Sequence, residues 1–255
     1  MRFEVFDLGL TDFRKTWEFQ KDIFARVKKG LLESGLIICQ HYPVITLGRS
    51  ADRKNILIGE QELRQRGISI CEVERGGDVT YHDPAQLTLY PIFNLNYLKK
   101  DIHLFLRCLE EVVIGLLEDF GIEGKRYPGL TGVWVGKEKI ASIGIAIKSW
   151  ISFHGLSINV KKDGLDNFCL IRPCGMDIKM TSLETIIAKN IAIDVLKETL
   201  ICKFRDVFSA EIFTGMSLDP STRVSSDGDT LSFSAESGSA YGGSGKDVPD
   251  KEEVG

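Results

Sequence analysis

The spacing of apolar residues predicts three long helices in this chain. In each, apolar side chains recur every three or four positions, which is typical of a helix packed by one face. The predicted helices cover residues 13–31, 102–120 and 194–208. Gly121 directly follows the second helix and is expected to end it. A short helix is predicted at residues 61–66, and Thr181 with Glu184 has the spacing of a capping box that would begin another.

Between these helices, runs of β-branched and aromatic residues predict strands. An alternating strand is expected after Gly77, and the others cover residues 1–7, 36–39, 44–47, 68–73, 86–93, 132–135, 139–148 and 151–160. Gly136 falls at a turn that would join two of them as a hairpin. Because strands come in runs between a few helices, the order favours an α+β fold over a doubly wound fold. We expect a mixed, largely antiparallel sheet packed with helices.

The C-terminal part of the chain has a different composition. Residues 221–255 contain eight Ser and six Gly and very few large apolar residues. Such a segment cannot bury enough apolar surface to offset the entropy lost on ordering. We therefore predict a globular domain over residues 1–213 and a disordered, Ser/Gly-rich acidic tail over residues 214–255.

Composition excludes several classes of protein. The formal net charge of −4 falls within residues 221–255, which hold three basic and seven acidic side chains, so the body is formally neutral. Such a body gives no sign of nucleic-acid binding. No apolar run approaches the roughly 18 residues of a membrane span, so no membrane association is expected. The first residues resemble neither a signal peptide nor a transit peptide, which favours a cytoplasmic protein.

The six cysteines are scattered without the spacing of a zinc site or a Cys-x-x-Cys motif, so no metal is expected. In a reducing compartment they should be free thiols. Five are predicted to be small buried hydrophobic residues, at positions 39, 71, 108, 169 and 202. Cys174 differs, because Pro173 restricts the backbone before it and Gly175 lets another molecule approach closely. This turn makes Cys174 the candidate nucleophile.

Two other segments contain candidate chemistry, and each also has a simpler explanation. Residues 75–77, Arg-Gly-Gly, could offer backbone amides to a ligand, but the same triplet can form a plain tight turn. His82 ends the strand that follows, where a structural role is the commoner one for a histidine. Lys139 stands beside a hairpin turn. Pointing inward, its ammonium would favour a thiolate and lower the pKa of a cysteine, whereas a solvated hairpin lysine would do neither.

Six motifs occur in order along the chain, at residues 41–49, 75–82, 132–135, 139–144, 153–160 and 172–175. Together they resemble the lipoyl(octanoyl) transferases of the biotin/lipoate protein ligase superfamily. The resemblance covers about residues 5–208 and leaves the tail out. It implies the α+β fold of biotin and lipoate protein ligases, in agreement with the order of the predicted elements.

The resemblance also implies roles for individual residues. Cys174 matches the nucleophile that forms an acyl thioester, and Lys139 matches the lysine that lowers its pKa. His154 and Arg49 lie in the matched motifs and are expected to support the site. The implied substrate-binding residues are Arg75, Gly76, Gly77, Asp78, Val79, Thr80, Tyr81, His82, Ser142, Ile143, Gly144, Gly155, Leu156 and Ser157.

The activity that the resemblance implies is transfer of an octanoyl group from octanoyl-acyl carrier protein to a lysine of a lipoyl domain. Acceptors would be the lipoyl domains of 2-oxoacid dehydrogenase E2 subunits and the glycine-cleavage H protein, in lipoate biosynthesis. Thioester exchange onto Cys174 followed by aminolysis is two-step covalent catalysis. Backbone amides near residues 142–144 are the suggested oxyanion donors. No ATP, metal or bound organic cofactor is required.

One departure from the family pattern is visible. Ala85 stands where glycine is usual, and this puts the shape of the loop after His82 in question. Ser157 stands where alanine is usual, which is a small change.

Two alternative functions stay open. An ATP-dependent lipoate or biotin ligase would share the fold but needs no nucleophilic cysteine. A non-catalytic module that binds lipoyl domains would need neither Cys174 nor Lys139. A papain-like thiol protease fits poorly, because its nucleophile comes early in the chain and Cys174 comes late.

Overall fold

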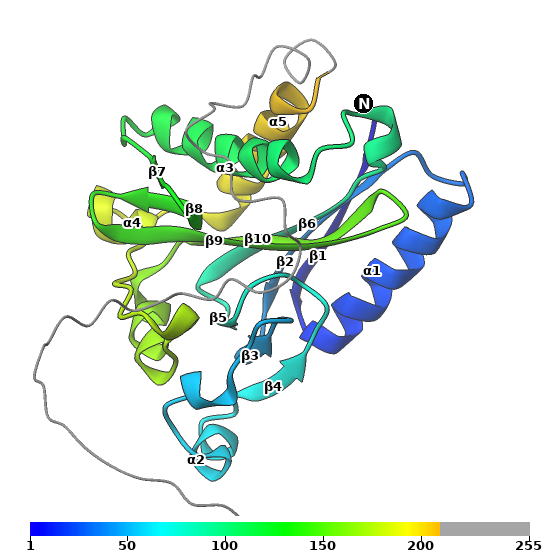
Figure 1. Cartoon of the computed structure of the whole chain (residues 1–255). Coiled ribbons are helices and arrows are strands. Elements are labelled where there is room, and N and C mark those ends of the chain that lie inside the picture. The colour runs from blue at the N-terminus through cyan, green and yellow to red at the C-terminus, as the bar shows by residue number, and fades with distance from the viewer. Residues whose placement is uncertain (210–255) are drawn as a thin grey trace, which may run out of the picture. The chain divides into compact units, whose positions relative to one another are not determined.

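The computed structural model describes residues 1–209, with the side chain of Cys174 excepted. Its main sheet has seven strands in the order β1-β2-β6-β10-β9-β8-β7 (Figure 1). β1 and β2 are parallel, and the other neighbouring pairs are antiparallel, so the sheet is mixed and largely antiparallel as predicted. The strands are β1 (Glu4–Thr11), β2 (Gly35–His41), β6 (Gln86–Ile92), β7 (Lys125–Tyr127), β8 (Leu130–Val135), β9 (Glu138–Lys148) and β10 (Ile151–Asn159).

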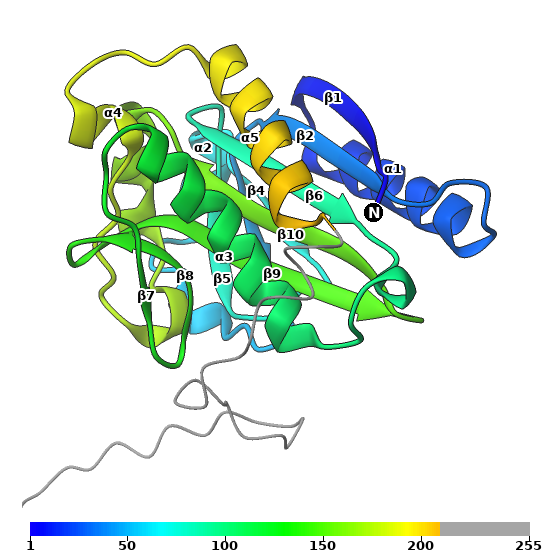
Figure 2. The ribbon, with the colours of Figure 1, turned by 90° about the horizontal axis from the view of Figure 1, so that it is seen from above.

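Helices cover both faces of the main sheet. One helix packs on one face, and two helices pack side by side on the other (Figures 1 and 2). The first is α1 (Phe13–Lys28), and the pair is α3 (Ile102–Asp119) and α5 (Ile193–Val207). The alternation of β2 shows how both faces are filled. Leu36 and Ile38 enter the core under α3 and α5, whereas Ile37 and Cys39 enter the core under α1.

A second sheet has three strands in the order β4-β3-β5. β3 is parallel to β4 and antiparallel to β5. Ile45 and Leu63 pack here with Phe168 in a core of their own. The elements are β3 (Val44–Leu47), α2 (Glu60–Gln65), β4 (Ser69–Glu72) and β5 (Val79–His82). Because this sheet contains parts of the motifs at residues 41–49 and 75–82, it places them next to each other.

Short helices complete the described part of the chain. They are η1 (Arg53–Asn55), η2 (Leu95–Tyr97), η3 (Lys162–Leu170), η4 (Pro173–Gly175) and α4 (Leu183–Ile187). Within residues 1–209, no helix combines the length and the apolar character needed to cross a membrane. The same residues contain no group of three or more His, Cys, Asp and Glu side chains that could hold a metal ion. The predicted domain end near residue 213 and the predicted tail lie outside the described residues.

Two predicted helix boundaries were wrong for reasons that the helix ends show, and the other predicted helices differ by one residue at one or both ends. α1 ends at Lys28, because Gly30 has a φ of +73° and the amide of Leu31 bonds back to Arg26 at 2.9 Å. This Schellman-type end leaves Leu31 70% exposed instead of packed. The capping residue of α4 is Ser182, one residue later than predicted, and its side chain accepts from the amide of Thr185.

The five cysteines predicted to be buried divide into two groups. Cys39, Cys71 and Cys108 are buried, as predicted. Cys169 and Cys202 are exposed, so the prediction was wrong for both. Cys169 lies in η3, and Cys202 lies on the outer side of α5.

Candidate active site

The loop of residues 75–78 contacts two other segments that contain motifs. The amide of Arg49 donates to the carbonyl of Arg75 at 3.0 Å, and the amides on either side of Arg49 donate to the same loop. The amide of Gly76 donates to the carbonyl of Ile145 in β9 at 2.8 Å. The backbone therefore joins three distant segments at one place. The side chain of Arg49 is exposed, so its observed support comes through its backbone.

Arg75 is tied to the small sheet by its side chain, which is only 8% exposed. Its Nε and Nη2 donate to the hydroxyl of Thr46 at 3.1 and 2.9 Å, and Nη2 also donates to the Thr46 carbonyl at 2.7 Å. A buried charge needs such partners, because water no longer solvates it. Thr46 lies inside a motif, but nothing in the sequence showed that it anchors Arg75.

Asp78 fixes the segment that borders the turn of Cys174. Its carboxylate accepts from the amide of Asp52 at 3.1 Å and from the side-chain amide of Asn55. The carbonyl of Asn55 in turn accepts from the amide of Arg172 at 2.8 Å. Asp78 thus supports the start of η4 through one intermediate residue. Asn55 lies outside every motif, and no sequence signal marked it.

The backbone of Cys174 lies in η4, and the chain after it returns to the first residues of β9. The amide of Lys139 donates to the carbonyl of Lys179 at 2.8 Å, and the amide of Thr181 donates to the carbonyl of Lys139 at 3.0 Å. The turn is therefore held at one end by Asn55 and at the other by Lys139. The role of Cys174 as the nucleophile stays a prediction.

The side chain of Lys139 is half-buried and crosses back over β8. Its Nζ donates to the carbonyl of Thr131 at 3.0 Å and lies 4.9 Å from the ring centroid of Trp134. Both contacts favour a charged ammonium. The register between β8 and β9 shifts at Ile140, and such a bulge redirects neighbouring side chains. Lys139 is thus held against β8 by two contacts, and the action of its ammonium on Cys174 stays a prediction.

Two predicted binding segments lie side by side in the main sheet. Residues 142–144 of β9 pair with residues 155–157 of β10, with Gly144 opposite Gly155. Leu156 enters the main core, so its side chain packs there. In β5, Val79 and Tyr81 likewise enter the core of the small sheet. Their predicted part in substrate binding would therefore rest on backbone groups and packing.

His82 is buried and neutral. Burial, with smaller contributions from His41 and Arg75, lowers its pKa to about 3. The side-chain nitrogen Nε2 of Gln86 donates to the carbonyl of Tyr81 at 3.0 Å, so the side-chain oxygen Oε1 of Gln86 faces Nδ1 of His82 at 3.1 Å. Nδ1 therefore carries the proton, and Nε2 can accept a hydrogen bond. The imidazole therefore has a hydrogen-bond partner inside the protein, as expected for the structural role that the sequence left open as an alternative.

His154 supports the loop of residues 75–78 from the side of α1. Its backbone has a φ of +56°, which is rare for a residue with a side chain, and its amide donates to the side chain of Gln20 at 2.9 Å. This conformation places its imidazole beside the ring of Phe153 and 3.3 Å from the carboxylate of Glu74. Burial lowers the pKa of His154 to about 4, although Glu74 raises it. Because Glu74 directly precedes Arg75, His154 braces the start of the loop.

Ala85 does not strain the loop after His82. It is not among the described residues with positive φ, so its backbone needs no glycine. Its carbonyl accepts from the amides of Val160 and Lys161 at 3.0 Å, and its own amide donates to Asp83 at 2.9 Å. The departure from the family pattern is therefore accommodated in a regular, hydrogen-bonded turn.

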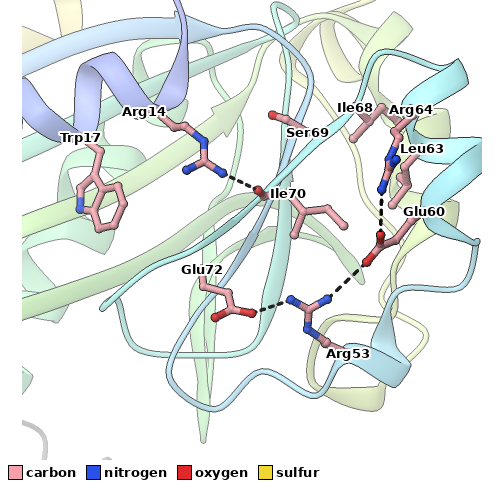
Figure 3. A pocket seen from close by; sticks show the side chains of 10 residues that line it. All are labelled: Arg14, Trp17, Arg53, Glu60, Leu63, Arg64, Ile68, Ser69, Ile70 and Glu72. Carbon is pink, nitrogen blue, oxygen red and sulfur yellow. Dashed lines mark hydrogen bonds and ion pairs between the residues drawn. The ribbon is translucent and has the colours of Figure 1, made fainter.

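A groove of about 660 Å³ opens beside edge strand β4 (Figure 3). Arg14 and Trp17 of α1 line one side, and ion pairs of η1, α2 and β4 line the other. None of its lining residues belongs to the six motifs. The groove is therefore a separate surface feature and not the predicted acyl site.

Comparison with known proteins places the chain among its relatives. Residues 12–205 match the family model described as the lipoyl protein ligase A/B catalytic domain. The octanoyltransferase of a Thermoanaerobacter species is 44% identical, with 85% of this chain and 94% of the relative covered. The octanoyltransferase of Solibacter usitatus is 40% identical, with 83% and 95% covered.

Solved structures show the same fold at low sequence identity. Lipoate-protein ligase A bound with ATP has a TM-score of 0.67 at 17% identity, with 81% of this chain and 85% of that chain covered. A putative lipoate protein ligase of T. acidophilum with bound lipoic acid has a TM-score of 0.64 at 16% identity, with 81% and 86% covered.

The chain belongs to the lipoyl protein ligase A/B catalytic-domain family. Within that family its place is with the octanoyltransferases, which are acyltransferases of lipoate biosynthesis. The predicted family, fold class and enzyme class are thereby confirmed. The roles predicted for individual residues stay predictions.

Proposed function

We propose that this chain moves an octanoyl group from octanoyl-acyl carrier protein to a lysine of a lipoyl domain through a thioester on Cys174. The acceptors are the lipoyl domains of 2-oxoacid dehydrogenase E2 subunits and the glycine-cleavage H protein. The names of the curated relatives support the reaction class. The turn around Cys174 supports the covalent route, because a ligase that uses ATP would not need it.

The observation that carries this proposal is the placement of Lys139. Its amine is held by the carbonyl of Thr131 at 3.0 Å, and its backbone pairs with the segment that follows Cys174. An ammonium in this position stabilises a nearby thiolate relative to the thiol and so lowers the pKa of the cysteine. The backbone pairing of Lys139 with the segment after Cys174 is what supports the assignment of its ammonium to the thiol.

In the first step, the thiolate of Cys174 attacks the carbonyl carbon of the octanoyl thioester. The bond between that carbon and the sulfur of the carrier's phosphopantetheine breaks, and the leaving sulfur takes the proton of the Lys139 ammonium. The products are an octanoyl-Cys174 thioester, a free pantetheine thiol and a neutral Lys139 amine. One thioester replaces another, so the step is close to balanced in free energy.

In the second step, the neutral amine of the acceptor lysine attacks the acyl-enzyme. Lys139 accepts a proton from the attacking nitrogen as the new C–N bond forms, and the bond to the sulfur of Cys174 breaks. The thiolate and ammonium are thereby restored. Conversion of a thioester to an amide is favourable, so this step drives the transfer forward.

Intact mass spectrometry tests this proposal in one experiment. After mixing with octanoyl-carrier protein and no ATP, the enzyme should gain the mass of one octanoyl group, and peptide mapping should place it on Cys174. Cys174→Ala should gain nothing. Cys169→Ala is the matched control, because Cys169 is an exposed thiol in the same segment, and it should be acylated like the unchanged enzyme.

The alternatives predict different results in the same assay. An ATP-dependent ligase would transfer octanoate only with free acid and ATP and would tolerate Cys174→Ala. A non-catalytic binding module would form no acyl-enzyme under either condition. An octanoyl group found on Cys169 or on a lysine would overturn the proposed route.

A further inference from the structure

We infer that Glu110 is a positioning residue for Lys139 and acts through the peptide bond between Thr131 and Gly132. The inference rests on the proposed function, in which the ammonium of Lys139 ionises Cys174. Glu110 belongs to no motif and lies on α3, far from these residues in the sequence.

Glu110 is a buried carboxylate with a defined set of partners, and its side chain is only 1% exposed. Its Oε2 accepts from Nη1 of Arg107 at 2.6 Å and from Nε of Arg126 at 3.1 Å. Its Oε1 accepts from the amide of Gly132 at 3.1 Å. The two arginines balance the negative charge, so Glu110 acts on β8 mainly by holding this amide in place.

That amide belongs to the same peptide group as the carbonyl of Thr131. The Thr131 carbonyl accepts from Nζ of Lys139 at 3.0 Å. Because a peptide group is rigid and planar, fixing its N–H end also fixes the direction of its C=O end. A carboxylate at one end and an ammonium at the other polarise the group in the same sense, which strengthens both hydrogen bonds. Glu110 therefore helps to determine where the ammonium of Lys139 lies.

Gly132 is required for this arrangement. Its φ is +136°, a conformation that residues with side chains rarely adopt. A Cβ at this position would lie 2.5 Å from Cε of Lys139 and 2.6 Å from the carbonyl oxygen of Ala141. The side chain of Lys139 thus occupies the space that the missing Cβ leaves, directly over the peptide group that Glu110 holds.

The test is the pH dependence of Cys174 alkylation, followed by peptide mass spectrometry so that other thiols do not interfere. In Glu110→Gln, the side-chain NH₂ group is a donor and cannot accept a hydrogen bond from either arginine. The side chain should therefore keep its oxygen toward the arginines and turn its NH₂ group toward Gly132, whose amide then loses its acceptor. Gly132→Ala should displace Lys139 directly while leaving Glu110 in place. For both variants we expect a higher pH midpoint and alkylation at pH 7 slowed by about threefold to tenfold, the size of a coupling between neighbouring residues.

Glu111→Gln is the matched control. Glu111 also pairs with Arg126, but it is 38% exposed, and within residues 1–209 its carboxylate does not bond to the Gly132 amide. It should leave the midpoint unchanged. Circular dichroism and thermal unfolding identify variants that do not fold. If Glu110→Gln fails to fold, Glu110→Asp replaces it, because the shorter side chain keeps the charge for the arginines but should not reach the Gly132 amide, and it should raise the midpoint likewise.

A double-mutant cycle separates positioning of Lys139 from a general structural effect. In a Lys139→Met background, Glu110→Gln should produce no further change in the midpoint, because the group that it positions is gone. A persisting shift, or a folded Glu110→Gln with an unchanged midpoint, would overturn the inference and leave the proposed function standing. If Lys139→Met itself left the midpoint unchanged, the proposed function would fail first and the inference with it.

Discussion

Two ionic networks in this chain use the same residue types in very different surroundings. Around Glu110, a carboxylate that is 1% exposed binds two arginines and a backbone amide. In the groove beside β4, Arg53 and Glu72 pair at 2.6 Å, but their side chains are 60% and 69% exposed. Exposed pairs contribute little, because water and salt compete for both partners. Burial and contact with the backbone, and not the number of ion pairs, therefore distinguish a network that positions a reactive group.

The largest expected effect breaks the buried network. Glu110→Ala should lower the free energy of unfolding by about 3 kcal/mol, because it leaves two partly buried arginines without their shared carboxylate. Urea denaturation measures this effect. Glu111→Ala, which removes a more exposed carboxylate from the same helix, should cost less than about 1 kcal/mol. Equal losses in the two variants would show that burial does not distinguish the networks.

The next effect concerns stability against pH. Burial lowers the pKa of His41 and of His154 to about 4 and that of His82 to about 3, whereas an unfolded histidine titrates near 6.5. The unfolded chain therefore binds more protons below pH ~6.5, and each histidine lowers the free energy of unfolding by about 1.4 kcal/mol per pH unit. The loss should develop as the pH falls from ~6.5 toward ~4.

Unfolding measured between pH 7 and 5 tests this expectation. His41→Gln should reduce the slope of stability against pH by about 1.4 kcal/mol per unit. His103→Gln is the control, because His103 is exposed, and it should leave the slope unchanged. An identical slope in all three proteins would mean that His41 is protonated in the folded state.

A smaller effect is expected at the border of the Cys174 turn. Asn55→Ala removes the link between Asp78 and the segment that binds the amide of Arg172, so the turn should lose its fixed geometry. We expect acyl-enzyme formation to slow by about tenfold, or ~1.4 kcal/mol of barrier, measured by quenched-flow mass spectrometry. The exposed Asn96→Ala should react at the original rate, and a similar rate in Asn55→Ala would remove Asn55 from the account.

The smallest effect is expected in the exposed network. Arg53→Ala breaks pairs with Glu72 and Glu60 whose members are all exposed. It should change the free energy of unfolding by less than about 0.5 kcal/mol and leave acyl transfer unchanged. A loss of transfer would mean that the groove takes part in the reaction, which the account does not expect.

The sequence predicted most of the elements, because their periodicity is strong. The hairpin of β8 and β9, the strand β10 and the end of α3 before Gly121 all follow from local patterns. Leu31 misled the prediction because it continues the helical spacing, although Gly30 has already ended the helix. Thr181 and Ser182 can both cap α4, and spacing does not choose between them.

The site was less predictable where long-range contacts decide it. The motifs identified candidate residues for the site of Cys174. The direction of the Lys139 side chain depends on the bulge at Ile140, and the alternation of apolar and polar residues does not predict a bulge. Glu110 looks like an ordinary polar residue of a helix, and its burial follows only from the packing of α3 against β8. Asn55 binds Asp78 through its side chain and Arg172 through its backbone carbonyl, and no sequence pattern marks either contact.

The most direct test of the account compares the thiol pKa of Cys174 in three proteins by alkylation across a pH series. An unperturbed cysteine titrates near ~8.5. We predict a midpoint below that value in the unchanged enzyme, a higher midpoint in Lys139→Met, and no change in Lys137→Met, whose lysine is exposed in the same hairpin. If Lys139→Met and Lys137→Met gave the same midpoint as the unchanged enzyme, Lys139 would not ionise Cys174 and the central claim would be wrong.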